Sequence, residues 1–270
     1  MRTINLLMLL VLLGMFLVGG CEVIVNKLAF HPDNVNVIPE NELPKGVEEF
    51  SIETDDKLII RSLFLRAKES DKVVIYFHGN AGNIYHRIPS LLRLRQFGLN
   101  VVGVSYRGYG KSEGEPSEDG IYLDGKAVFN YVSNKLGFEH KNIIVIGRSI
   151  GTTVAINTTQ NKDIGGLILV APLTSGKAHA NAGSLSSVSS LAGNSFDNIN
   201  KIKNIKTPIM VIHGTKDRVI PYSMGKEIFD AANSEKKLVT INGAGHNDLH
   251  NVYAKKYWTS IFSFLKTTWD

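Results

Sequence analysis

The sequence predicts an α/β protein with a mostly parallel sheet of about eight strands and helices on both faces. Six short apolar runs recur along the chain, at 73–77, 101–105, 143–146, 167–170, 209–212 and 238–241. These runs are too uniformly apolar to alternate, which is typical of strands that are buried on both faces. Segments with apolar residues spaced by threes and fours separate most of the runs, as expected of helices that cover a parallel sheet.

The N-terminal part of the chain differs from the rest. Residues 1–20 contain an unbroken apolar stretch at 6–18, shorter than the roughly 20 residues that a helix needs to cross a bilayer. We therefore expect a signal peptide over 1–20. Two glycines precede Cys21, which resembles the bacterial lipoprotein signal, in which the cysteine is acylated. The resemblance implies an exported protein held on a bacterial cell membrane by a lipid at Cys21. The alternatives are a plain signal peptide and an uncleaved anchor.

The cysteine content and the net charge limit the kinds of protein and partner that fit this sequence. Cys21 is the only cysteine of the 270 residues, so a disulfide within the chain is impossible. The formal net charge is +5, and the densest basic stretch, 201–206, alternates with apolar residues before an apolar run. This pattern argues against a nucleic-acid partner. The length fits one catalytic domain at 46–270, preceded by a tether and lead-in at 21–45.

Two further strands and two notable helices complete the predicted elements. Residues 49–53 and 57–65 have strand character and flank a turn with two aspartates, which predicts an antiparallel hairpin before the first apolar run. Residues 152–160 are expected to form a helix, and apolar residues spaced by threes and fours between Leu249 and Leu265 predict a closing helix.

The segment 147–151 has the pattern G-x-S-x-G. It directly follows the run 143–146 and opens the expected helix at 152–160. Glycines on both sides of a serine in this context allow a sharp turn that lifts the hydroxyl clear of the backbone. A serine at a helix N-terminus also lies near unpaired N–H groups that can stabilise negative charge. These features make Ser149 the candidate nucleophile.

A second segment, 110–114, has the same pattern with Ser112 at its centre. It follows a polar stretch and precedes Glu115 and Pro116, so no strand leads into it and no helix follows at once. We therefore expect Ser112 to be a surface-turn serine. A phosphate-binding loop would need glycine five positions before Gly110, where Ser105 stands, so nucleotide binding is set aside.

A serine hydroxyl needs a general base, and the base needs a group that orients it. Asp217 follows the run 209–212, and His246 follows the run 238–241. Both then lie at carboxyl ends of strands, where an open α/β sheet places its site. Their order after Ser149 is the one expected when the serine stands on a strand-to-helix turn. We assign His246 as general base and Asp217 as its orienting group.

Other candidates fit these roles less well. His213 lies at a strand end and is expected to serve structure. His246 and His250 are four residues apart, a spacing that can bind metal on one helix face, but no third ligand accompanies them. We therefore expect neither a metal nor a cofactor. Three other aspartates lie before a strand, in a polar stretch and within a helix: Asp163, Asp197 and Asp230.

An oxyanion also needs hydrogen-bond donors. The segment 78–83 follows the run 73–77, and a loop in this place can aim a backbone N–H into the site. We assign one donor to the backbone of Asn80 and the other to the backbone of Ile150, the residue after the nucleophile. His78 is expected to be a buried, hydrogen-bonded turn residue.

Ser149, Asp217 and His246 in this order, with 78–83 and 106–110, resemble the α/β-hydrolase superfamily. The most similar branch contains membrane-associated hydrolases that are also grouped with serine-aminopeptidase-like enzymes, and the resemblance covers about 28–270. It implies the α/β-hydrolase fold and acyl transfer to water through an acyl-serine, with a small-molecule acyl substrate. A carboxylic ester is the preferred substrate class, with thioester and peptide as alternatives. The alternative of another class is a catalytically silent binding or scaffolding lipoprotein, against which the complete set of three groups argues.

The polar stretch 175–198 departs from that branch, whose members often carry larger or more aromatic residues there. Residues 176–198 follow the run 167–170 at the carboxyl edge of the predicted sheet, so we expect a small lid over the site. Leu185, Val188 and Leu191 recur every three residues and are expected to line the acyl pocket. The alternative is a disordered connector with no role.

Overall fold

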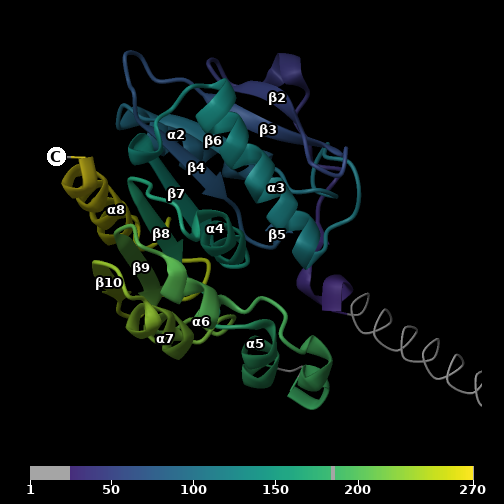
Figure 1. Cartoon of the computed structure of the whole chain (residues 1–270), viewed down its shortest axis with the longest axis vertical. Helices are drawn as coiled ribbons and strands as arrows, with labels where there is room; N and C mark the ends of the chain where they lie inside the picture. The colour runs from purple at the N-terminus through teal and green to yellow at the C-terminus, as the bar shows by residue number, and fades with distance from the viewer. Residues whose placement is uncertain (1–24, 184–185, 270) are drawn as a thin grey trace, which may run out of the picture.

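The structure is a computed structural model that describes residues 25–183 and 186–269. Its centre is an eight-stranded sheet with the order β10-β9-β8-β7-β4-β6-β3-β2 (Figure 1). β3 is antiparallel to both β2 and β6, whereas all other neighbouring pairs of this sheet are parallel. The predicted fold class is confirmed. The strands are β2 Glu48–Glu53, β3 Ile59–Leu65, β4 Val73–Phe77, β6 Asn100–Val104, β7 Ile143–Arg148, β8 Gly166–Val170, β9 Ile209–Gly214 and β10 Lys236–Ile241.

Every predicted strand is found, and the differences lie at the ends. β7 and β9 extend two residues beyond the apolar runs, because the neighbouring strands still offer backbone partners. Arg148 pairs with Val170, and Gly214 pairs with Ile241. Hydrogen bonding across the sheet, and not side-chain hydropathy, therefore decides where these strands end. The extension brings Arg148 to the carboxyl edge of the sheet.

Helices cover both faces of the sheet, and the inner strands β4, β6, β7, β8 and β9 are buried on both sides. In β4, Val73, Ile75 and Phe77 belong to one buried cluster, while Val74 and Tyr76 belong to the other. α3, α4 and α7 pack on the first face, and α2 and α8 pack on the second (Figure 1). These helices are α2 Ile88–Gln96, α3 Glu118–Asn130, α4 Gly151–Thr159, α7 Tyr222–Ala231 and α8 Ala254–Trp269.

Shorter elements complete the described chain. They are α5 Gly176–Ala182, α6 Asn198–Lys201, the π-helical turn η3 Tyr131–Lys135, and the 3-10 turns η1 Glu40–Glu42, η2 Tyr85–Arg87, η4 His140–Asn142, η5 Ser186–Ala192 and η6 Ile202–Asn204. Within 25–183 and 186–269, no helix has the length and apolar character needed to span a bilayer.

The closing helix begins later than the sequence pattern predicts. α8 starts at Ala254, and residues 246–253 form turns instead. Asp248 organises these turns, since its carboxylate accepts a hydrogen bond from the N–H of Gly245 and its carbonyl accepts one from Tyr253. Val252, which fits the apolar spacing, is 73% exposed. The polar turn leaves His246 on a loop and not on a helix.

The lead-in to the domain packs against the sheet edge that carries the predicted site. Residues 25–29 are helical, and the buried ring of Phe30 meets Phe196 edge to face at 6.1 Å. The next two residues form β1 His31–Pro32, which pairs in parallel with β5 Ala81–Gly82. Asn83 donates from its side chain to the carbonyls of Asp33 and Asn36. The lead-in therefore holds the loop that follows β4.

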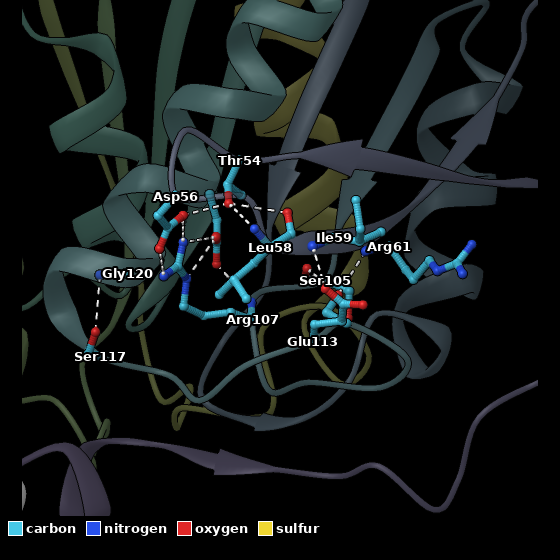
Figure 2. Close-up of polar contacts among 12 residues, drawn as sticks. Thr54, Asp56, Leu58, Ile59, Arg61, Ser105, Arg107, Glu113, Ser117 and Gly120 are labelled. Carbon is cyan, nitrogen blue, oxygen red and sulfur yellow. Dashed lines mark hydrogen bonds and ion pairs between the residues drawn. The ribbon is translucent and has the colours of Figure 1, made fainter.

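The segment 106–114 is fixed by a buried ionic network (Figure 2). Arg107 donates from Nε to the buried carboxylate of Asp124 at 2.9 Å and from Nη1 to Asp56 at 2.7 Å. Ser112 Oγ accepts from the N–H of Arg61 at 2.8 Å and donates to the carbonyl of Ser105 at 3.0 Å. The Ser112 hydroxyl is thus used to join β3 to the chain after β6. It is half-buried, and so it is less of a surface residue than the sequence predicts.

Candidate active site

Ser149 stands on a tight turn between β7 and α4. Its φ is +55°, a left-handed conformation that is uncommon for a residue other than glycine. The two flanking glycines make this turn possible. A Cβ on Gly151 would collide with the carbonyl oxygens of Phe77 and His78, and a Cβ on Gly147 would collide with the first turn of α4. Glycine at both positions therefore lets strand, turn and helix approach backbone to backbone.

The structure brings the three predicted side chains together. His246 Nε2 lies 3.1 Å from Ser149 Oγ, and His246 Nδ1 lies 2.7 Å from Asp217 Oδ2. An ionised carboxylate only accepts hydrogen bonds, so Nδ1 carries the proton and Nε2 is free to accept one from the serine hydroxyl. This tautomer is the one that a general base needs. Each residue comes from a different loop at the carboxyl edge of the sheet.

Asp217 is held as an ionised acceptor. Its side chain is fully buried, and Oδ1 accepts hydrogen bonds from the backbone N–H groups of Val219 and Ile220 at 2.9 and 2.8 Å. Burial alone would raise the pKa of Asp217, but hydrogen bonds from His213 and His246 and from the backbone hold that pKa well below its usual range. The carboxylate therefore stays charged at every pH at which an imidazole titrates.

His213 supports Asp217 from behind. Its ring is fully buried, and Nε2 lies 2.9 Å from the carbonyl of Ile220 and 3.3 Å from Asp217 Oδ2. Gly225 packs directly against the ring, where any Cβ would overlap Nδ1. The sequence assigned this histidine to structure, and its ring lies between α7 and the segment that presents Asp217.

The loops that carry Asp217 and His246 are joined to each other and to β7. β9 and β10 are parallel neighbours, so their carboxyl ends meet at one edge. The N–H of Lys216 donates to the carbonyl of Ala244 at 2.9 Å. Arg148 donates from Nη2 to the carbonyl of His246 at 3.0 Å and to Asn247 Oδ1 at 2.9 Å. The residue before the candidate nucleophile therefore fixes the loop of the candidate base.

The loop after β4 lies beside Ser149. A Cβ on Gly79 would be in van der Waals contact with the Ser149 side chain, at 3.4 Å. Asn80 Oδ1 accepts from the N–H of His31 at 2.8 Å and from the Tyr109 hydroxyl at 3.2 Å. These bonds engage the Asn80 side chain outside the site and orient its peptide unit. Asn80 and Ile150, the two assigned oxyanion donors, both line the same pocket as Ser149.

His78 is a buried turn residue, as predicted. Its ring is fully buried, Nδ1 lies 2.6 Å from the carbonyl of Gly79, and the Tyr106 ring packs 4.5 Å away. Burial lowers the pKa of His78 to about 3, so the ring stays neutral. The Tyr106 hydroxyl donates to the His78 carbonyl at 2.9 Å. The segment 106–110 thus supports the loop after β4, which explains why both motifs belong to one site.

Ser149 and His246 open into a pocket of about 750 Å³. Its apolar lining residues come from the lead-in, from the segment after β8 and from the loop after β9: Val25, Leu28, Leu173, Leu191, Phe196 and Ile220. Of the predicted lid residues, Leu191 therefore lines the pocket. Leu185 and the side chain of Val188 lie outside the described part of the chain. Cys21 and the predicted signal peptide also lie outside it.

Sequence reasoning did not assign to the site five basic residues that line the pocket: Arg87, Arg148, His179, Arg218 and His250. Arg148 had a signal, because it directly precedes the serine in the G-x-S-x-G motif. Arg87 and His179 lie on η2 and α5, and only the fold brings them to Ser149. His250 lies in the turns before α8, so it does not form a helical metal pair with His246. The described residues contain no group of three or more potential metal ligands.

Comparison with known proteins agrees with this geometry. Residues 68–200 and 196–251 match the family described as serine aminopeptidase, S33. Human alpha/beta hydrolase domain-containing protein 17B is 31% identical over 206 residues, which cover 76% of this chain and 70% of the human protein. Caenorhabditis elegans alpha/beta hydrolase domain-containing protein aho-3 is 34% identical over 186 residues, or 68% of this chain. The match spans about half of the worm protein's length, 55%.

Solved structures show the same fold. The Pyrococcus furiosus esterase Pf2001 superposes with a TM-score of 0.74 at 23% identity, covering 88% of this chain and 98% of the esterase. Acetyl xylan esterase 1 from Thermoanaerobacterium gives a TM-score of 0.68 at 16% identity, covering 84% of this chain and 86% of that enzyme. At these identities the likeness concerns the fold alone. With the family match and the human relative, we conclude that the chain belongs to the serine aminopeptidase S33 family of the α/β-hydrolase superfamily and is an enzyme of the hydrolase class.

Proposed function

We propose that the protein hydrolyses carboxylic esters through an acyl-serine intermediate, with Ser149 as nucleophile, His246 as general base and Asp217 as its orienting group. The observation that carries the proposal is the continuous hydrogen-bond chain from Asp217 Oδ2 through His246 to Ser149 Oγ, at 2.7 and 3.1 Å, with its serine end open to the pocket. Such a chain makes a weakly nucleophilic hydroxyl reactive at neutral pH.

Each step uses atoms placed by this arrangement. Ser149 Oγ attacks the ester carbonyl carbon while its proton passes to His246 Nε2. The imidazolium then gives that proton to the departing alkoxide, and the acyl group stays on Ser149. A water molecule attacks the acyl-serine, its proton passes to Nε2, and the carboxylic acid leaves as Oγ recovers the proton. Asp217 stabilises the imidazolium in both halves and keeps its own charge.

The negative charge on the carbonyl oxygen is met by the backbone N–H groups of Asn80 and Ile150. The position of Ile150 at the start of α4 adds the positive end of the helix dipole. The close packing of Gly151 against the end of β4 supports this assignment, because it holds the two peptide units at one place. Removing one such donor typically lowers turnover by about 10²- to 10³-fold.

The segment 176–198 acts as a lid in this proposal, with Leu185, Val188 and Leu191 on the acyl side of the pocket. The contact of Leu191 with the pocket supports it. Acylation of Cys21 would place a membrane anchor four residues before Val25, which lines the same pocket. An enzyme tethered in this way would meet amphiphilic acyl substrates at the membrane surface.

A fluorophosphonate probe tests the nucleophile directly. The wild-type protein should be labelled, the Ser149→Ala variant should not, and the Ser112→Ala variant should be labelled like the wild type. Hydrolysis of p-nitrophenyl butyrate should follow the same order. An unlabelled, inactive wild-type protein would instead favour a catalytically silent binding lipoprotein. Equal labelling of the Ser149→Ala variant would move the nucleophile elsewhere.

A further inference from the structure

The pocket beside Ser149 is lined by basic side chains and by no acidic one among the described residues. Three arginines and three histidines line it, Arg87, Arg148, Arg218, His179, His246 and His250, whereas no Asp, Glu or Lys is among its described lining residues. The whole chain is close to balanced, with 30 Lys and Arg against 25 Asp and Glu. The concentration of positive charge is therefore a local property of the pocket and does not follow from the composition.

Arg148 has neutral partners only. It is 8% exposed, and its Nη2 donates to the carbonyl of His246 and to the amide oxygen of Asn247. None of the ion pairs between described residues includes it. Its positive charge is therefore buried at the site without a carboxylate to balance it.

Arg87 also lacks a carboxylate partner among the described residues. It ends η2, is half-buried, and donates from Nη2 to the carbonyl of Ala81 at 2.6 Å, while its Nε is buried and has no hydrogen-bond partner. Burial lowers the pKa of Arg87, and the nearby charge of Arg148 acts in the same direction. No ion pair between described residues includes Arg87 either.

Two neighbouring guanidinium groups without an acid are unfavourable in a folded protein, since each loses hydration and they repel each other. A bound anion would reverse both effects. Planar guanidinium groups also match the geometry of carboxylate and phosphate, to which they can donate two parallel hydrogen bonds. The same pocket also has apolar lining residues, among them Leu28, Leu191 and Phe196, and Ser149 opens into it.

We propose that Arg87 and Arg148 bind an anionic group, a carboxylate or a phosphate, of the acyl substrate, while an apolar portion of that substrate lies against the apolar lining residues of the same pocket. The preferred substrate is thus an amphiphilic acyl ester with a negative charge. The inference deepens the proposed function and rests on it for the reaction itself.

The anion can belong to the acyl part or to the leaving group, and matched substrates separate the two. In the acyl arm, p-nitrophenyl hydrogen succinate is compared with its neutral methyl ester. In the leaving-group arm, butyryl glycerol phosphate is compared with monobutyryl glycerol. We expect kcat/KM for the anionic member to exceed that for the neutral member by about 10- to 100-fold in one arm, because hydrogen bonds to charged groups contribute that much. The arm that shows the preference locates the charge.

Variants then test whether the preference comes from Arg87. Arg87→Gln should reduce the anionic-to-neutral ratio to near one, and Arg87→Lys should restore part of it. Arg93→Gln is the matched control, since it removes one exposed charge from α2, which follows directly on Arg87, and it should leave the ratio unchanged. Arg148 is unsuited to this test because it also holds the His246 loop. Ratios near one in both arms, or a ratio that survives Arg87→Gln, would overturn the inference.

A binding measurement separates this inference from the proposed chemistry. Calorimetry with hexyl phosphate on the Ser149→Ala variant needs no turnover. Hexyl phosphate should bind at least tenfold more tightly than its neutral dimethyl ester, and the added Arg87→Gln change should remove the difference. If fluorophosphonate did not label the wild type but hexyl phosphate still bound selectively, the proposed reaction would be overturned and the anion site would stand. Normal labelling with no selective hexyl phosphate binding would overturn the anion site alone.

Discussion

Two turns of the chain share the pattern G-x-S-x-G, and the molecule uses their serines in opposite ways. At 147–151 the hydroxyl of Ser149 points away from the backbone, 3.1 Å from the His246 ring, and opens into a pocket. At 110–114 the hydroxyl of Ser112 is hydrogen-bonded to two backbone groups, the N–H of Arg61 and the carbonyl of Ser105, and so joins β3 to the chain after β6. The same five-residue pattern therefore gives a reactive group in one place and a structural bond in the other.

The surroundings of the glycines explain the difference. Gly151 faces the backbone of Phe77 and His78, so its turn is pressed into the end of the sheet between a strand and a helix. Gly114 has φ of +77° and faces the flexible end of the Leu58 side chain. The first turn is packed backbone to backbone between a strand and a helix, whereas the second is held by hydrogen bonds to β3, including the one from the N–H of Glu113 to the carbonyl of Ile59. A motif thus acquires catalytic meaning from the elements on either side of it.

The largest contrast is expected for the two serine substitutions. Ser149→Ala should lower kcat for p-nitrophenyl butyrate by about 10³-fold or more, because it removes the hydroxyl that lies 3.1 Å from His246 Nε2. Steady-state kinetics on purified variants measure this. Ser112→Ala should retain kcat within about twofold. Similar losses in the two variants would mean that the two turns do not differ in the way their contacts indicate.

Asp217→Asn tests the proposed role of the turn at 147–151 by removing the group that orients the general base His246. The amide can no longer enforce the tautomer in which Nε2 accepts the Ser149 proton, so kcat should fall by about 10²- to 10⁴-fold while the fold is retained. Circular dichroism and kinetics together report both effects. Asp230→Asn, on the exposed side of α7, is the matched control and should behave like the wild type. Full activity in Asp217→Asn would require another carboxylate in that role.

The two glycines at the ends of the turns give a third contrast. Gly151→Ala would push a methyl group into the carbonyls of Phe77 and His78, so the free energy of unfolding should fall by about 3 kcal/mol and activity should fall with it. Gly114→Ala meets a movable Leu58 side chain and carries mainly the strain of its positive φ, about 1 kcal/mol. Urea titrations of both variants measure the values. Equal destabilisation would show that backbone contact at Gly151 is unimportant.

The pH dependence of turnover tests whether Asp217 stays ionised. Since the lowered pKa keeps Asp217 charged, kcat should depend on a single ionisation, rising by about tenfold per pH unit on the acid side and then levelling off. A slope of about two would reveal a second titrating group. The lowered pKa of Asp217 also stabilises the fold above its unfolded-state pKa of about 3.9, and this contribution is lost as the pH falls further.

The smallest effect concerns the stability role of Ser112. Its hydroxyl makes one hydrogen bond as donor and one as acceptor, so Ser112→Ala should lower the free energy of unfolding by about 1 to 2 kcal/mol. Thermal and urea denaturation measure this, and Ser133→Ala on η3 serves as control with little change, because among the described residues the half-buried Ser133 hydroxyl bonds only to the neighbouring Asn130 and Asn134. An unchanged free energy of unfolding in Ser112→Ala would show that the two hydrogen bonds of this serine do not contribute to stability.

Several features of the molecule were predictable because they depend on short stretches of chain. Uniformly apolar runs gave the strands from β4 onward, since only a sheet buried on both faces needs such runs. The glycines around Ser149 identified a turn between a strand and a helix. Asp217 and His246 followed from their places after two strands, because parallel strands present their carboxyl ends at one edge.

Other features follow from contacts between distant parts of the chain, and the sequence pattern failed there. The apolar spacing placed the start of the closing helix before Asp248, whose hydrogen bonds stabilise turns instead. The lead-in had no clear pattern, yet its backbone pairs with β5 and its side chains line the pocket. Neither interaction leaves a periodic signal, because each depends on a partner elsewhere in the chain.

The sequence by itself therefore determined the class of fold and the three groups of the proposed reaction, since local patterns specify buried strands and the turns that follow them. Only the tertiary structure decided what surrounds those groups. Arg87 and Arg148 lie 61 residues apart in the sequence, and no sequence pattern around them predicts that both line one pocket. Packing of η2, β7 and the turns before α8 brings them together. The charge of the pocket is thus set by three-dimensional proximity, which the linear pattern does not record.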